Sequence, residues 1–222
     1  TGNTIMHNTA AGNGSGGMFC LNGTVEITDN VFSYNTALNT SSGGGIKCAY
    51  CNAIVSHNII SNNTSAYDGG GIYCLGDNVV VSYNFISNNM AAMFGGGVYC
   101  RNEIQHVSDN VVSNNTAGEG GGGICFSGST AGITNNTISN NDALYGGALY
   151  FKSSSAPLIQ NTMLWGNTAP DGEQVYIWDD GSEPDFYYCN VQGGRDAFGL
   201  NSNVFYMGAY ENNIDSIPLF MS

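Results

Sequence analysis

Apolar and polar positions along this chain repeat with a period of 26 residues. Gly45, Gly71, Gly97 and Gly123 each close a Gly-Gly-Gly triplet, and each lies 26 residues from the next. Three short runs of alternating or β-branched residues follow a triplet, as at 72–74, 79–82 and 85–87. Such runs favour extended strands, and a period of this length is typical of stacked coils. The pattern predicts an all-β, single-stranded parallel β-helix (a β-solenoid) of about seven to eight coils, with three strands per coil.

One apolar residue of each strand recurs at the same place in successive coils, which predicts three interior rows that form a narrow dry core. The rows are Met18, Ile46, Ile72, Val98, Ile124 and Leu149; Ile27, Val55, Val81, Val107 and Ile133; and Phe32, Ile60, Ile86, Val112 and Ile138.

Asparagine recurs at two turns of the repeat. The two rows are Asn30, Asn58, Asn84, Asn110 and Asn136, and Asn35, Asn63, Asn89, Asn115 and Asn141. They could form a strip that binds a ligand. The interpretation we favour is structural, because stacked amides can satisfy one another from coil to coil and asparagine tolerates the left-handed conformation of a tight bend.

Four of the seven cysteines, Cys20, Cys48, Cys74 and Cys100, share one repeat position two residues beyond an inward apolar residue. We expect them inside the column as free thiols, which behave as small apolar side chains. Cys125 falls one position early and should point outward. The single Cys-x-x-Cys at Cys48 lacks the second pair or the histidines of a zinc site, so neither a metal nor a cofactor is predicted.

The outward position of the first strand carries a row rich in aromatic residues. We take Phe19, Lys47, Tyr73, Tyr99 and Tyr150 as a candidate ligand-binding face, because aromatic rings at regular spacing can stack on sugar rings. The alternative is that tyrosine is simply a good strand former whose neighbours pack against one another.

Charge limits the possible partners. The chain carries 17 acidic and 4 basic residues, a formal net charge of −13, which repels nucleic acid and anionic membranes. No run of 18 apolar residues predicts a membrane span. Asp77, Glu103 and Arg101 form the one mixed-charge cluster that the repeat brings together, and the acidic stretch 178–185 lacks the spacing of a calcium loop. We therefore expect no enzyme; if there is one, it is a polysaccharide lyase or glycoside hydrolase.

Both ends depart from the repeat. Residues 3–10 already match the middle of a coil, so we expect the chain to be a processed piece or fragment that lacks its first coils. After residue 192 the pattern gives way to an irregular tail rich in aromatic residues. We divide the chain into β-helix repeats at 1–192 and a capping tail at 193–222.

Two motifs carry a resemblance to a known group. Gly146-Gly147-Ala148-Leu149 and Phe32-Ser33-Tyr34-Asn35 match the two motifs of the polymorphic outer membrane protein repeat. The chain thus resembles bacterial right-handed parallel β-helix proteins of the pectate-lyase-like superfamily. The resemblance implies a right-handed coil and an exported protein that acts at the cell surface, as a structural or adhesion module that contacts glycans or a neighbouring cell. The alternative is a carbohydrate-binding or polysaccharide-degrading β-helix that uses the face at Tyr73 and Tyr99.

Overall fold

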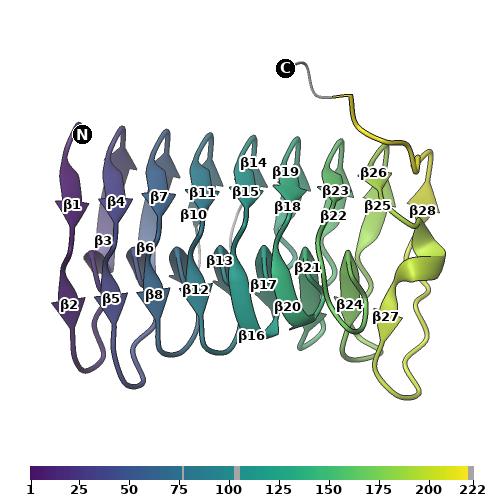
Figure 1. Cartoon of the computed structure of the whole chain (residues 1–222), viewed down its shortest axis with the longest axis horizontal. Coiled ribbons are helices and arrows are strands. Elements are labelled where there is room, and N and C mark those ends of the chain that lie inside the picture. Colours follow the sequence, from purple (N-terminus) through teal and green to yellow (C-terminus); the bar gives the residue numbers. More distant parts are fainter. Residues whose placement is uncertain (77, 103–105, 220–222) are drawn as a thin grey trace.

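The computed structural model describes residues 1–76, 78–102 and 106–219 and shows coils stacked along one long axis (Figure 1). Strands of successive coils pair in parallel to form three sheets. The first sheet has eight strands and so marks eight turns. They are Thr4–Met6 (β1), Val31–Ser33 (β4), Ile59–Ser61 (β7), Phe85–Ser87 (β11), Val111–Ser113 (β15), Thr137–Ser139 (β19), Met163–Trp165 (β23) and Asn190–Val191 (β26).

The second sheet has fourteen strands in two arms, which meet because two long strands run through both. These long strands are Met18–Thr28 (β3) and Ile46–Ser56 (β6). One arm continues with Ile72–Leu75 (β9), Val98–Arg101 (β13), Ile124–Ser127 (β17), Leu149–Lys152 (β21), Val175–Ile177 (β24) and Gly199–Leu200 (β27). The other arm continues with Val79–Ser82 (β10), His106–Ser108 (β14), Gly132–Thr134 (β18), Leu158–Gln160 (β22), Asp185–Tyr187 (β25) and Tyr210–Glu211 (β28).

The sequence predicted three strands per coil and did not predict a third sheet, which gives the three middle coils a fourth strand. Its six strands are Thr9–Ala10 (β2), Thr36–Ala37 (β5), Thr64–Ser65 (β8), Met90–Ala91 (β12), Thr116–Gly120 (β16) and Asp142–Tyr145 (β20). Most are two residues long, too short to show alternation. Their small inward side chains, such as Ala91 and Ala117, are buried and add a fourth interior row.

The predicted interior rows are confirmed by the register. Ile72 pairs with Ile46 and Val98, Val81 with Val55 and Val107, and Ile86 with Ile60 and Val112. The cysteine row is confirmed in the same way, since Cys48 pairs with Cys20 and Cys74, and Cys74 with Cys100. All seven cysteines are free. Like residues therefore lie over like residues along the column.

The asparagine rows hold the coils together as the structural interpretation predicted. Asn84 Nδ2 donates to Asn110 Oδ1 (3.0 Å) and to Val55 O (2.8 Å), while Asn84 Oδ1 accepts from the backbone N–H and Nδ2 of Asn58. At each bend, the residue in the left-handed conformation is not the row asparagine itself. Tyr83, which precedes Asn84, has φ of 55°, so the row asparagine serves as the hydrogen-bonding partner and not as the bend itself.

The first part of the C-terminal tail still pairs with the strands of the column. Gly199 pairs with Tyr176, and Tyr210 pairs with Phe186. A 3-10 turn at Arg195–Ala197 precedes these two tail strands, and the rings of Phe198 and Tyr210 pack on Phe186 with centroids 5.2 and 6.0 Å away. The tail therefore covers part of the last coil, and the division at residue 192 stays a prediction.

Candidate functional site

The aromatic row on the outside of the first strand is buried, so the expectation that Tyr73, Tyr99 and Tyr150 are exposed is wrong. Their exposed fractions are 6%, 3% and 2%. Together with Cys125 and Tyr176 they form a second apolar cluster, separate from the core inside the coils. Cys125 thus lies on the outer side, as predicted, but is fully buried. Of the five residues proposed as a ligand-binding face, only Phe19 is exposed and Lys47 half-buried.

A turn at the first glycine of each triplet explains why the row is covered. Gly69, Gly95 and Gly121 have φ of 66°, 68° and 69°, a left-handed conformation that glycine adopts without strain. A Cβ on Gly69 would lie 2.6 Å from Ile72 O and 2.9 Å from Tyr73 Cβ. The absence of a side chain lets the preceding loop fold back directly onto the outer row.

Rings stack along this covered row. The Tyr73 and Tyr99 centroids are 5.3 Å apart at 14°, and those of Tyr150 and Tyr176 are 5.6 Å apart at 7°. Such offset contacts add to the stability gained by burial. Desolvation raises the pKa of Tyr73 and, more strongly, of Tyr99, so both hydroxyls stay neutral. The row as a whole is packed like an interior and not presented as a surface.

A cleft of about 400 Å³ opens where the covering loops stand apart over the C-terminal part of the row. The Phe94 and Tyr150 centroids are 5.4 Å apart, and Tyr150 and Trp178 are 6.4 Å apart. Trp178 is 44% exposed, so its ring is accessible at the edge of the cleft. The lining is mainly apolar, with one basic and one acidic residue: Phe94, Glu119, Leu144, Tyr145, Tyr150, Lys152 and Trp178.

Basic side chains lie along the same row. Lys152 Nζ is 3.2 Å from the centroid of Phe94, and Lys47 Nζ lies 5.1 Å from Phe19 and 5.5 Å from Tyr73. Arg101 lies close enough to Tyr73 for the interaction with its hydroxyl to raise the pKa of Arg101. Three of the four basic residues of this acidic chain therefore contact one aromatic row.

Asp68 belongs to one of the covering loops, and its carboxyl group is buried. Desolvation raises its pKa to about 6, partly opposed by the charges of Lys152 and Arg101. Its Oδ1 accepts a hydrogen bond from the backbone N–H of Phe94 (3.3 Å). Asp68 therefore joins the loop of one coil to that of the next, beside the tyrosines.

The sequence did not identify the residues that cover the row, although a signal was present. Asp68, Phe94, Gly120 and Tyr145 share one repeat position, directly before the first glycine of each triplet. Because the residue type at this position differs from coil to coil, the position did not stand out in the sequence as a structural row. Of the predicted mixed-charge cluster, Asp77 and Glu103 lie outside the described residues.

The fold and this geometry agree with a comparison of families. The family of right-handed β-helix regions matches residues 1–162 and 95–217. The chain belongs to the right-handed β-helix family. This confirms the predicted fold and the handedness, while the closer likeness to the outer membrane protein repeat stays a prediction. Comparisons with curated proteins and with solved structures gave no match.

Within residues 1–76, 78–102 and 106–219, no group of three or more His, Cys, Asp or Glu residues is arranged so that it could hold a metal ion. Over the same residues, the structure contains no helix with the length and apolar character needed to cross a membrane.

Proposed function

We propose that this β-helix is a non-catalytic extracellular module, structural or adhesive, and that its aromatic cleft binds saccharides. The observation that supports the proposal most is the group of Phe94, Tyr145, Tyr150 and Trp178 around a single cleft. Aromatic rings offer flat apolar faces for the C–H faces of sugars, and a few polar groups then fix the orientation. Lys152 and Glu119 supply a donor and an acceptor at this cleft.

The rigid column favours binding over catalysis. Successive coils fix the rings by register, so the ligand meets a preformed surface and little ordering opposes binding. The location outside the cell and the contact with glycans of a neighbouring surface are part of the same proposal, and they rest on the resemblance described above. The net charge of −13 argues against nucleic acid as the partner.

Lys152 narrows the proposed ligand class. Its ammonium group lies on Phe94, within the apolar lining of the cleft, where a carboxylate would gain a charge-assisted hydrogen bond. We therefore expect saccharides that carry an occasional uronic acid to bind more tightly than neutral ones. Long polyuronates gain less, because the acidic surface repels them.

A glycan array probed with the intact chain tests the proposal, followed by calorimetry on the best ligand. We expect Trp178→Ala and Tyr145→Ala each to weaken binding by about three- to tenfold, the effect of one aromatic contact. Phe85→Ala is the matched control, because Phe85 is an exposed ring on a different sheet. Binding that survives the double variant Trp178→Ala/Tyr145→Ala would refute the assignment of the cleft.

Asp68 motivates a second candidate, a polysaccharide-degrading enzyme. A buried carboxyl group whose pKa lies near 6 can transfer a proton at neutral pH. Hydrolysis of a glycosidic bond usually needs a second carboxylate at a suitable distance. Release of reducing ends or unsaturated sugars that is lost in Asp68→Asn would replace the binding proposal with a catalytic one.

A further inference from the structure

Three thiols lie together at the N-terminal end of the column, away from the aromatic cleft. Cys20 of β3 and Cys48 of β6 are register partners, and Cys51 lies three residues further along β6. Cys48 and Cys51 both belong to the buried core, and Cys20 packs against it half-buried. The site is independent of the proposed saccharide binding.

The backbone of β6 explains how Cys48 and Cys51 come to face the same way. In a regular strand, residues three apart point to opposite sides. Tyr50 interrupts the alternation with φ of 52°, in the left-handed region that a bulky residue rarely adopts. Tyr50 is turned outward and is 61% exposed, and Cys51 returns to the inner side with Cys48. A strained bend thus brings a second thiol beside the first.

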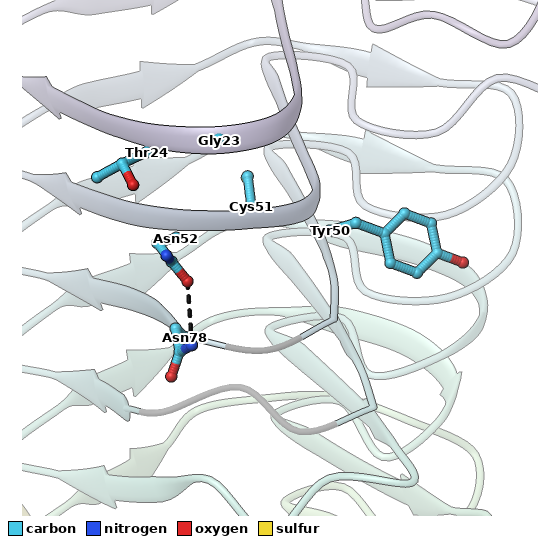
Figure 2. Close-up of a pocket in the computed structure, with 6 residues that line it drawn as sticks. All are labelled: Gly23, Thr24, Tyr50, Cys51, Asn52 and Asn78. Carbon is cyan, nitrogen blue, oxygen red and sulfur yellow. Dashed lines mark hydrogen bonds between the residues drawn. The ribbon is translucent and has the colours of Figure 1, made fainter.

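A surface hollow of about 270 Å³ lies against Cys51, lined also by Gly23, Thr24, Tyr50, Asn52 and Asn78 (Figure 2). Gly23 is the register partner of Cys51 in the preceding coil, and no atom lies within 4 Å of the place where its Cβ would be. Asn78 Nδ2 donates to Asn52 Oδ1 (3.0 Å) at the far side of the hollow. Cys51 is only 3% exposed, and this hollow is the opening that lies against its side chain.

The three thiols differ in acidity. Hydrogen bonding with Cys48, and to a lesser extent with Cys20, lowers the pKa of Cys51 to about 6, against the opposing effect of burial. Burial and the interaction with Cys51 raise the pKa of Cys20 to about 11, and the pKa of Cys48 is raised well above its usual value. Cys51 is therefore the thiol of the three that gives up its proton most readily. A thiolate is the reactive form of cysteine.

We propose that Cys20, Cys48 and Cys51 form a peroxide-reactive thiol site, in which Cys51 is oxidised first and one of its two neighbours then closes a disulfide. The Cys51 sulfur attacks one oxygen of hydrogen peroxide, the O–O bond breaks, and hydroxide leaves and takes up a proton to form water. The resulting sulfenic acid condenses with the thiol of Cys48 or Cys20; an S–S bond forms and a second water leaves. One peroxide is reduced by two electrons while two thiols become one disulfide.

The test treats the reduced intact chain with stoichiometric hydrogen peroxide at pH 7, with and without dimedone to trap sulfenic acid, and locates the products by mass spectrometry of a digest. We expect dimedone on Cys51 at least about tenfold above Cys189, a buried thiol whose pKa is raised by burial. Without dimedone we expect a disulfide that joins Cys51 to Cys48 or Cys20. Alkylation of Cys51 by iodoacetamide should reach half its maximal rate near pH 6.

Variants separate this site from general thiol oxidation. Cys51→Ala should abolish both products, whereas Cys189→Ala should leave them unchanged, with circular dichroism as the check of folding. In Cys20→Ala/Cys48→Ala, Cys51 loses the hydrogen bonds that lower its pKa and should react more slowly, and the sulfenic acid that does form should persist because no neighbouring thiol can condense with it. The proposal is overturned if Cys51 in the unmodified chain reacts no faster than Cys189, or if its sulfenic acid accumulates without forming a disulfide.

Discussion

The buried polar residues of this column differ in how many of their hydrogen-bonding groups have a partner. Asn84 has partners for its amide nitrogen and oxygen on both neighbouring coils. Asp68 has a single hydrogen bond to a backbone N–H and is 5% exposed. A buried polar group stabilises only when its hydrogen bonds replace those lost to water. We therefore expect substitutions of these two residues to change stability in opposite directions.

Substituting Asn84 should be costly. Asn84→Ala leaves the buried N–H of Asn58 and the carbonyl of Val55 without a partner, and each unsatisfied group costs about 1–3 kcal/mol. We expect the free energy of unfolding to fall by about 3 kcal/mol in urea denaturation. Asn52→Ala is the control, since Asn52 is exposed and should change stability by no more than about 0.5 kcal/mol. Equal effects of the two variants would contradict the role of the buried row.

Substituting Asp68 should stabilise the protein above pH 6. Its pKa is about 6 when folded, against 3.8 unperturbed, so the folded state binds the proton more tightly than the unfolded state. The contribution of Asp68 to stability is therefore most favourable below about pH 4 and decreases as the pH rises through about 6, by up to about 3 kcal/mol. Asp68→Asn keeps an acceptor for the Phe94 N–H and carries no charge. We expect the variant to be more stable at pH 7.5 and to lose this pH dependence, measured by urea denaturation from pH 4 to 8.

At the scale of the elements, a coil in the middle of the column consists of four strands, as in β9 to β12, together with a loop that folds back over the first strand. The sequence predicted which side of that strand Tyr73 and Tyr99 occupy, because alternation within a strand is a local property. It did not predict that they are buried, because that depends on Gly69 and Gly95, whose left-handed turns fold the loops onto them. Repeating patterns therefore revealed the strands and the rows, while the loops that shape the cleft are not periodic.

The same limit applies to the candidate site. Tyr150 was identified from its repeat position, but Trp178 and Tyr145 were not, because no row of like residues marks them. The left-handed bend at Tyr50 was equally hidden, since tyrosine rarely adopts it, and the sequence showed Cys48 and Cys51 only as a Cys-x-x-Cys without a zinc site. The spacing of the sequence predicted the stacked coils, but it did not predict the residues that depart from the repeat.

Burial of the outer row has a direct consequence for stability. Tyr99→Ala should lower the free energy of unfolding by about 3–5 kcal/mol, as for a large core residue, because the ring is 3% exposed and stacks on Tyr73. Phe85→Ala, at a 47% exposed ring on β11, should cost less than half as much. Guanidinium denaturation measures both. A change below about 0.5 kcal/mol in Tyr99→Ala would instead indicate an exposed row.

On the scale of the whole molecule, the column is a sum of nearly equivalent coils, each of which contacts its neighbours. Gly71 and Gly97 occupy the same place in successive coils, since the residues that follow them, Ile72 and Val98, are register partners. A whole coil can therefore be removed without changing the path of the chain at the junction.

Deletion of residues 72–97 should leave a shorter, folded β-helix. The deletion removes 26 of 222 residues, so we expect the denaturant m-value to fall by about 12% while the far-ultraviolet circular dichroism keeps its shape. Deletion of residues 72–84 is the control, because half a coil places apolar rows over polar turns and should prevent folding. A folded half-coil variant would argue against coil register as the source of stability.

The direction of the inter-coil hydrogen bonds also determines how the protein responds to tension. The bonds between paired strands and between row asparagines point from coil to coil along the long axis, so a pull on the two termini loads them along their own length. Coils should then detach one after another, and each would release about 90 Å of extended chain. A tether built in this way lengthens in steps under load and keeps its remaining turns intact.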